Sequence, residues 1–202
     1  MSQLPDIIRE IPRVAADVVA QAATYQAAIL ADVAGRRGTL HGRISPVHEQ
    51  MKVAGPAFTV EVRPGDNLMI HAAIALAQPG DVLVIDGKAD LTAALMGTLM
   101  LSACKKRGLA GVVIDGAIRD KLELLDLGFP VFCAGYNPAG PTKYVPGRIN
   151  HAISAGGATI QPGDLVVGDA DGVVIIEREK APAMLALACL LYTSDAADDS
   201  LR

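Results

Sequence analysis

The chain is poor in aromatic side chains and contains no tryptophan. Phe, Tyr and Trp make up only 3% of its 202 residues, whereas 51% of the residues are hydrophobic. Its core must therefore be packed mainly from Ala, Val, Leu and Ile. No apolar run reaches the roughly 20 residues that a spanning helix needs, and the N-terminus lacks the pattern of a signal peptide. We expect a cytoplasmic protein without membrane contact, folded as a single domain.

An excess of positive charge is also lacking. The formal net charge is -4 and the pI is about 5.5, so no broad basic field is available for a polyanion, and nucleic-acid binding is disfavoured. A small acidic substrate would need cations placed locally. The three cysteines, Cys104, Cys133 and Cys189, are far apart and form no C-x-x-C motif. We expect each to be a buried, reduced thiol.

Several common catalytic motifs are missing. The sequence contains neither G-x-G-x-x-G nor a P-loop, which disfavours dinucleotide and nucleoside triphosphate binding. Its four histidines show no H-x-H or H-E-x-x-H spacing, which disfavours a histidine-rich zinc site. No serine or cysteine has the sequence context of a nucleophile elbow. Any catalytic chemistry must therefore rest on other groups.

What the sequence does contain is a repeated phrase, "PGD", at residues 64–66, 79–81 and 162–164. Proline and glycine suit the central positions of a tight turn, and the aspartate can bond to nearby backbone. An apolar run follows each phrase. We therefore interpret all three as turns that lead into strands, and their aspartates as turn formers.

Apolar periodicity and helix-stop signals predict an α/β protein. Helices are expected within residues 5–34, 68–78, 92–108 and 121–129, and strands at 82–86, 111–115, 130–135 and in a hairpin over 157–176. Residues 82–115 thus form a strand-helix-strand unit, and α/β proteins usually build their sites at the strand ends of such units.

The C-terminal segment does not match the rest of the chain. A helix begins near residue 181, but "YTSDAADDSLR" has no apolar face. One interpretation is a frayed polar tail. We favour another, because "CLLYTSDAADD" resembles translated sequencing-adapter DNA. We therefore predict a single domain over residues 1–188 and a non-native or disordered tail over 189–202.

Two places in the strand-helix-strand unit are candidates for a site. Gly97 interrupts the helical pattern; if the helix instead begins after it, the backbone N–H groups of Thr98, Leu99 and Met100 form an anion site. The alternative is a close helix crossing at a small residue. Beyond the strand of "GVVID", which we expect to turn at Gly116, the sequence places Arg119 and Asp120 side by side.

Arginine grips a carboxylate through two parallel hydrogen bonds, and aspartate is a ligand for Mg²⁺ or Mn²⁺. The alternative is a surface ion pair, with Asp120 capping the helix that follows. Further aspartates at strand ends are either supporting residues of the site or, more simply, turn formers: Asp86, Asp90, Asp115, Asp169 and Asp171.

The phrases "GDNLMIHAAIALAQPGDVLVID", "GTLM", "GVVIDGAIRD", "FPVF" and "PGDLVVGDADGVV", in this order, resemble the RraA-like family. That family includes 4-hydroxy-4-methyl-2-oxoglutarate aldolases and regulators of ribonuclease E activity. The resemblance spans about residues 28–177. It implies an αββα-type sandwich resembling the swivelling β/β/α domain, assembled as a homotrimer or a hexamer with sites at subunit interfaces.

The resemblance also implies roles for the candidate residues. Arg119 would hold the carboxylate of a small 2-oxo acid, and Asp120 would bind the divalent cation, Mg²⁺ or Mn²⁺. The backbone of Gly97, Thr98, Leu99 and Met100 would bind the oxo-acid end. These roles imply a metal-dependent aldolase that releases pyruvate from a 4-hydroxy-2-oxo dicarboxylate, with oxaloacetate decarboxylase activity at the same site.

The sequence departs from the active aldolases of this family at two points. They commonly carry an acidic residue where this chain has Thr98. They also use an acidic residue from a neighbouring subunit's C-terminal region, which we expect to be foreign or missing in this chain. The alternative function is therefore a non-enzymatic regulator that binds and inhibits ribonuclease E. The Arg119 and Asp120 pair favours the enzyme, whereas Thr98 favours the regulator.

Overall fold

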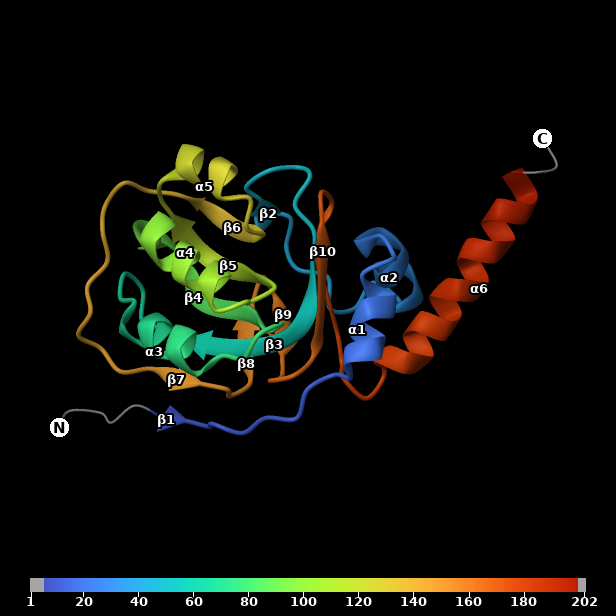
Figure 1. The fold of residues 1–202 in the computed structure, drawn as a ribbon, viewed down its shortest axis with the longest axis horizontal. Helices are drawn as coiled ribbons and strands as arrows, with labels where there is room; N and C mark the ends of the chain where they lie inside the picture. The colour runs from blue at the N-terminus through green and yellow to red at the C-terminus, as the bar shows by residue number, and fades with distance from the viewer. Residues whose placement is uncertain (1–5, 200–202) are drawn as a thin grey trace.

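The computed structural model describes residues 6–199, and side chains as far as residue 191. Figure 1 shows a sheet between layers of helices and smaller strands, with the last helix extending away from the body. The helices are α1 (Ala16–Ala22), α2 (Ala27–Val33), α3 (Leu68–Leu76), α4 (Thr98–Lys106), α5 (Lys121–Leu127) and α6 (Ala181–Asp199). The strands are β1 (Asp6–Ile7), β2 (Ser45–Pro46), β3 (Val53–Glu61), β4 (Val82–Met96), β5 (Gly111–Ile118), β6 (Val131–Tyr136), β7 (Arg148–Ile149), β8 (Ile153–Ala155), β9 (Ala158–Ile160), β10 (Leu165–Asp169) and β11 (Gly172–Ile176).

The central sheet has the order β1-β7-β3-β4-β5-β6-β2, and its inner strands β3, β4, β5 and β6 are parallel. Parallel strands are joined by helices that cover the sheet, so such strands are apolar on both faces. β4 shows this clearly: Leu83 and Ile85 pack in one core cluster, and Val82 and Val84 pack in another on the opposite face. The sheet therefore needs a covering layer on each side.

Three core clusters hold the layers together. One lies between the sheet and α3, α4 and α5; the second lies between the sheet and the pairs β8–β9 and β10–β11. The third joins the outer face of β10 and β11 to α1, α2 and the start of α6. The order of layers is helix, strand, strand, helix. The predicted α/β class and αββα sandwich are confirmed.

β3 belongs to both strand layers. Its first half, from Val53 to Pro56, pairs antiparallel with β10, and its second half, from Ala57 to Glu61, pairs parallel with β4. Where a strand passes from one sheet to the other, neighbouring backbone can come too close for a side chain. This happens at Gly55, because a Cβ built on it would lie 2.4 Å from the carbonyl oxygen of Gly80. The glycine thus permits the close approach that joins the two layers.

The prediction of a helix over residues 92–108 was wrong in its first part. Residues 92–96 belong to the end of β4, and α4 begins only at Thr98. β4 leaves the regular register after Asp86, passes through a partly exposed irregular segment, and pairs with β5 again at Ala94 and Met96. Its Ala, Leu and Met residues favour a helix locally, but pairing with β5 and burial keep them extended.

The turn expected at Gly116 was also wrong, because β5 continues to Ile118. Gly116 pairs with Asp90 in the irregular part of β4, and a Cβ built on it would lie 3.2 Å from the side chain of Leu95. The glycine therefore serves close packing within a strand and makes no turn there.

The three "PGD" phrases are turns, as predicted, although the first leads into α3 and not into a strand. Each aspartate bonds to nearby backbone: Leu68 N–H donates to Asp66, Gln78 N–H to Asp81, and Gln161 N–H to Asp164. Each also holds a distant segment. Arg13 donates two hydrogen bonds to Asp81 at 2.8 and 2.9 Å, which ties the N-terminal segment to the sheet.

An ion pair between the buried Asp115 and the half-buried Arg43 joins the strand layers beside β5. Asp115, only 3% exposed, accepts hydrogen bonds from Arg43 at 2.9 and 2.8 Å and from Gly156 N–H at 2.7 Å. Burial alone would raise the pKa of Asp115, but the hydrogen bonds from Arg43 and Gly156 bring the pKa below its ordinary value. The charged carboxylate is therefore the form that the fold stabilises.

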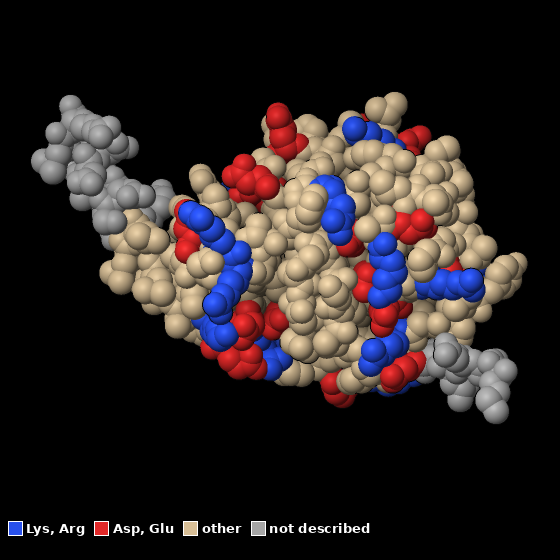
Figure 2. Space-filling model, turned by 180° about the vertical axis from the view of Figure 1, so that it is seen from behind, with Lys and Arg blue, Asp and Glu red and all other residues tan. Residues whose placement is uncertain are grey.

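Two of the cysteines are buried as predicted, but Cys189 is exposed on α6. Burial raises the pKa of Cys104 to about 12, so this thiol stays protonated at neutral pH. No helix within residues 6–199 is long and apolar enough to cross a membrane. On the face in Figure 2, basic and acidic side chains are interspersed.

α6 continues to Asp199, well into the segment predicted to be a non-native or disordered tail. Its first part is anchored in the core by Ala181, Leu185 and Ala188, whereas Leu190 and Leu191 are exposed. Among the side chains described on this helix, as far as residue 191, Ala188 is the last that is buried. The predicted domain boundary at this residue stays a prediction. The non-native origin of the tail stays a prediction.

We predict that Asp115→Asn will lower the free energy of unfolding at pH 7 by about 2 kcal/mol, because it removes the charge that pairs with Arg43 and leaves a buried hydrogen bond unmade. Urea denaturation followed by circular dichroism measures this change. Asp171→Asn, at an exposed residue of the turn between β10 and β11, is the control and should change stability little.

The stability difference between the wild type and Asp115→Asn should depend on pH. The pKa of Asp115 is lowered on folding, so its stabilisation is present above its ordinary pKa of 3.8 and is lost as the pH falls through the lower folded value. The stability difference between the wild type and Asp115→Asn should therefore shrink below about pH 4. A difference that grows on acidification would contradict this assignment.

Candidate functional site

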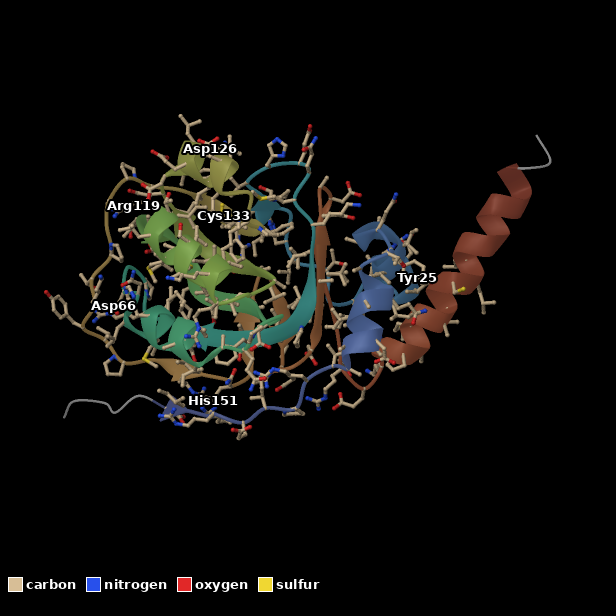
Figure 3. All side chains as sticks on the ribbon, viewed as in Figure 1. Tyr25, Asp66, Arg119, Asp126, Cys133 and His151 are labelled. Carbon is tan, nitrogen blue, oxygen red and sulfur yellow. The ribbon has the colours of Figure 1, made fainter. Side chains whose placement is uncertain are left out.

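The candidate residues meet where two parallel strands end. β4 and β5 finish side by side, with Met96 paired to Ile118, so Gly97 and Arg119 follow from adjacent strand ends. The backbone N–H of Arg119 donates to the carbonyl of Met96 at 3.0 Å, which fixes this edge. Arg119 lies at the end of the molecule bordered by the loop before β7 (Figure 3). The structure thus brings the predicted helix start after Gly97 next to Arg119 and Asp120.

Asp120 bonds to a different helix from the one that it precedes. It occupies the N-cap position of α5 with left-handed backbone (φ 66°), but its side chain makes no capping bond there. Its Oδ2 accepts a hydrogen bond of 2.9 Å from Thr98 N–H, the first residue of α4. The predicted alternative, a carboxylate capping α5, is therefore wrong. Asp120 is instead held across the site, near the positive end of the α4 dipole.

Gly97 is needed for this arrangement. A Cβ built on it would lie 2.5 Å from Oδ2 of Asp120 and 3.0 Å from Cγ of Arg119. No side chain can occupy that space without moving one of the two functional residues. The alternative of a close helix crossing at Gly97 does not hold, because the groups that approach it are the side chains of the site.

The predicted anion site is smaller than expected. Thr98 N–H donates to Asp120, and Met100 N–H donates to the carbonyl of Gly97 at 3.1 Å. At most one of the three N–H groups predicted to be open, that of Leu99, is left for a ligand. The hydroxyl oxygen of Thr98 is buried and has no partner among the described residues.

Arg119 and Asp120 are close, but they do not form a tight pair. Nε of Arg119 lies 3.8 Å from Oδ1 of Asp120, beyond hydrogen-bond distance, and their side chains are 45% and 36% exposed. Both therefore keep hydrogen-bonding capacity for a ligand. An exposed ion pair of this length contributes little to stability, so folding alone gives no reason for it.

Two adjoining cavities open at these residues. One, of about 340 Å³, is lined by Arg119, Asp120, Lys121 and Tyr136, and the ammonium group of Lys121 lies 4.7 Å from the centre of the Tyr136 ring. The other, of about 360 Å³, is lined by the start of α4, by Arg119 and Asp120, and by residues of α3 and the loop before β7. Small carboxylic acids fit either volume.

Three residues on the second cavity were missed by the sequence analysis: Asn67, His71 and Lys143. The phrase "GDNLMIH" contains the first two, and their spacing of four residues, which places side chains on one face of a helix, is the signal that was available. No sequence signal connected them to Lys143, because that contact depends on how the loop folds back.

The five further aspartates have structural partners elsewhere. None of these five aspartates is among the described residues that line the two cavities. Asp115 pairs with Arg43, Asp86 with Lys88, and Asp90 with Thr92. Asp169 accepts hydrogen bonds from Ala27 N–H and Asp171 N–H, in the hairpin turn between β10 and β11. The simpler interpretation, turn formers and structural pairs, therefore holds for these residues.

A metal ion at the site would rely on a single protein carboxylate, that of Asp120. Within the described side chains, no three His, Cys, Asp or Glu residues cluster closely enough to hold an ion by themselves. Mg²⁺ and similar cations commonly use one or two carboxylates and complete their coordination with water and substrate oxygens. Oδ1 of Asp120 accepts no hydrogen bond from the described residues and fits this role.

The fold and these residues define an α/β protein with an arginine and a carboxylate at the carboxyl ends of parallel strands, a class of site that suits small acidic ligands. Residues 15–175 match the family model described as RraA-like, Aldolase/RraA. The chain belongs to the RraA-like family.

Three proteins that are similar to this chain carry informative names. A protein of Halalkalibacterium halodurans, provisionally named a 4-hydroxy-4-methyl-2-oxoglutarate aldolase, is 45% identical over 162 residues, covering 80% of this chain and 77% of that protein. Streptomyces coelicolor RraAS2, described as an unusual member of the RNase ES inhibitor RraA family, superposes with a TM-score of 0.87 at 28% identity, over 94% and 99% of the two chains.

The other structure is from Geobacillus kaustophilus and carries the name S-adenosylmethionine:2-dimethylmenaquinone methyltransferase. It superposes with a TM-score of 0.70 at 32% identity, over 76% of this chain and 95% of that one. The names of these similar proteins thus include an aldolase, a member of an RNase ES inhibitor family and a methyltransferase. Fold alone does not choose among them, so the choice depends on the site.

We predict that Gly97→Ala will displace Asp120 or Arg119 and lower ligand affinity at the site at least tenfold, because its Cβ has no room. Calorimetric titration with pyruvate in the presence of Mg²⁺ measures the affinity. Gly42→Ala is the matched control, since a Cβ there meets nothing within 4 Å. Equal affinities for the two variants would show that Gly97 is not required.

Proposed function

We propose that the protein is a carbon–carbon lyase that cleaves 4-hydroxy-4-methyl-2-oxoglutarate, or a related 4-hydroxy-2-oxo dicarboxylate, to release pyruvate. We also propose that it decarboxylates oxaloacetate, and that it uses Mg²⁺ or Mn²⁺. The observation that carries the proposal is the pair of Arg119 and Asp120, which share one cavity edge and are not consumed by a mutual ion pair. The name of the relative from H. halodurans supports the same reaction class.

In this proposal the two residues take different parts of one substrate. The guanidinium of Arg119 binds the carboxylate next to the 2-oxo group through two parallel hydrogen bonds, which fixes the orientation of the substrate. Asp120 would hold the divalent cation, which when bound supplies the positive charge that favours enolate formation. The Thr98 N–H bond holds the Asp120 carboxylate in one orientation, so the charge is placed before the substrate arrives.

Oxaloacetate decarboxylation and aldol cleavage require the same binding of the 2-oxo acid end. In both reactions a bond to the carbon next to the 2-oxo group breaks, and its electron pair is left on pyruvate enolate. The same Arg119 and Asp120 therefore serve both, and one site accounts for two activities.

We propose a homotrimer or hexamer in the cytoplasm as the working form. Two large apolar side chains beside the site support a subunit interface there: Leu99, on the first turn of α4, is 87% exposed, and Tyr144, in the loop before β7, is 83% exposed. A subunit interface at this place would cover both side chains, as interfaces on soluble proteins cover exposed apolar surface.

We predict that the protein releases pyruvate from oxaloacetate and from 4-hydroxy-4-methyl-2-oxoglutarate in the presence of Mg²⁺. A chelator should abolish the release. Asp120→Asn should lower kcat/KM at least a hundredfold, because an amide keeps a hydrogen-bond acceptor for Thr98 but loses the charge that holds a cation. A lactate dehydrogenase coupled assay measures the pyruvate.

Asp126→Asn is the matched control, because Asp126 lies exposed on the same helix and does not line either cavity. It should retain wild-type activity. Release of pyruvate that is equally fast with chelator, or that survives Asp120→Asn, would rule out the proposed reaction.

The second candidate is a non-enzymatic regulator that binds and inhibits ribonuclease E. Thr98 favours it, because the first turn of α4 carries no acid there, and the description of the S. coelicolor structure names an RNase ES inhibitor family. The test is co-purification with a ribonuclease E scaffold, together with inhibition of RNA cleavage. Inhibition that persists in Asp120→Asn, in a protein without lyase activity, would establish this candidate.

A further inference from the structure

A cavity of about 780 Å³ has no part in the mechanism proposed above. It lies between the loop that follows α2 and the hairpin of β8 and β9. None of the described residues that line it lines either cavity of the candidate site. Figures 1 and 3, drawn in the same view, place α2 and Arg119 toward opposite ends of the body. The cavity is therefore a separate place on the molecule.

The loop after α2, residues 34–39, has the sequence AGRRGT, and we call it the arginine loop. Its backbone is fixed at both ends. Arg36 N–H donates to the carbonyl of Ala31 in α2 at 2.8 Å, and the carbonyl of Gly38 accepts a hydrogen bond of 2.9 Å from Ile175 N–H in β11. A side chain at Gly38 would overlap the carbonyl group of Ile175, so the loop lies directly on the strand.

Arg36 occupies a conformation that its own chemistry does not favour. Its backbone is left-handed, with φ 63°, and so is that of Gly35 before it. Glycine adopts this region freely, whereas a residue with a Cβ is strained there. Arg36 is exposed, so packing does not explain an arginine at this position any better than backbone geometry does. Strained residues of this kind cluster at ligand sites.

The charges of the arginine loop are unpaired. The described residues that line the cavity include three cations and two carboxylates: Arg36, Arg37, Lys180, Asp164 and Glu177. Both carboxylates are engaged, because Glu177 accepts a hydrogen bond of 2.7 Å from Lys180, and the buried Asp164 accepts from two backbone N–H groups. The side chains of Arg36 and Arg37 make no hydrogen bond or ion pair with the described residues. Two guanidinium groups are thus left for an anion.

Other lining residues add apolar surface and hydroxyl groups. Val33, Ile176 and Met184 are apolar, and Thr39 and Thr159 carry hydroxyls. A cavity of this volume suits a small organic ligand. Guanidinium groups bind phosphate oxygens through pairs of parallel hydrogen bonds. The combination suits a molecule with phosphate groups at one end and an apolar ring at the other.

We propose that this cavity binds a small organic diphosphate of the nucleoside diphosphate type, with its phosphates held by Arg36 and Arg37 and its ring on the apolar surface. The site uses two arginines on a fixed loop and needs none of the glycine-rich motifs that the sequence lacks. It is independent of the proposed lyase, because the two sites share no lining residue among those described.

The test measures the binding of ADP, adenosine and inorganic diphosphate to the full chain by calorimetric titration. A chelator is present throughout, so that no divalent cation bridges the phosphates to Asp120. ADP should bind with a Kd below about 1 mM, and about tenfold or more tightly than either adenosine or diphosphate. The reason is that only ADP carries both the phosphates and the ring.

Substitutions of the two arginines locate the binding. Arg36→Gln and Arg37→Gln should each weaken ADP binding about tenfold or more, the expected effect of losing a charge-assisted contact, and leave adenosine binding unchanged. Arg63→Gln, at an exposed arginine that does not line the cavity, is the matched control and should keep wild-type affinity for ADP. Arg119→Gln should keep that affinity as well, because Arg119 belongs to the other site.

Arg36→Gly separates binding from folding. Glycine suits the left-handed backbone at this position, so the variant should be no less stable than the wild type in thermal denaturation. It should nevertheless lose ADP affinity as Arg36→Gln does. A loss of affinity in a protein of undiminished stability cannot be a consequence of misfolding.

A wild type that does not bind ADP at about 1 mM, or that binds adenosine as tightly, would overturn the proposal. So would arginine-loop variants that keep wild-type affinity, or an Arg119→Gln variant that loses it, which would place ADP at the candidate site. Diphosphate that binds as tightly as ADP would overturn the role of the apolar surface. The readout is binding without a cation, so the presence or absence of lyase activity does not enter it.

Discussion

Burial of the parallel strands on both faces is the constraint on which the rest of the structure depends. β4 and β5 carry apolar side chains on each face, so a layer must cover each side: α3, α4 and α5 on one, and the β10–β11 and β8–β9 pairs on the other. Those pairs expose a further apolar face, which α1, α2 and α6 cover. The same constraint fixes where the strands end, because parallel strands that share a core finish at a common edge.

The site uses that rigid edge. Gly97 and Arg119 come directly after paired strand ends, so their relative position is set by the sheet and not by loop flexibility. The bond from Thr98 N–H to Asp120 then joins the start of α4 to the end of β5. It occupies an N–H group that an isolated helix terminus would offer to an anion, and in exchange it orients a carboxylate beside a guanidinium. The result is a site for a ligand with both an anionic group and an oxygen suited to a cation.

The repeated "PGD" phrase shows how one local motif acquires different roles. All three aspartates bond to backbone within a few residues, as turn chemistry requires. Their second partners differ: Asp81 holds Arg13 of the N-terminal segment, whereas Asp66 holds the loop that carries Lys143. The turn is a property of three adjacent residues, but the second partner depends on which distant segment passes by. For that reason Asp66, interpreted from sequence as a turn former, also shapes a wall of the cavity.

The sequence by itself determined the α/β class, the three "PGD" turns, the short helices and the adjacency of Arg119 and Asp120, because these depend on periodicity and on neighbours within a few residues. It also offered a helix start after Gly97 as one of two alternatives. Only the tertiary structure decided between them, since pairing with β5 overrides the helical preference of residues 92–96. It alone decided that Asp120 caps α4 and that Asn67, His71 and Lys143 line the same cavity as Arg119. Those relations join segments 20 to 80 residues apart, and local patterns carry no information about contacts at that separation.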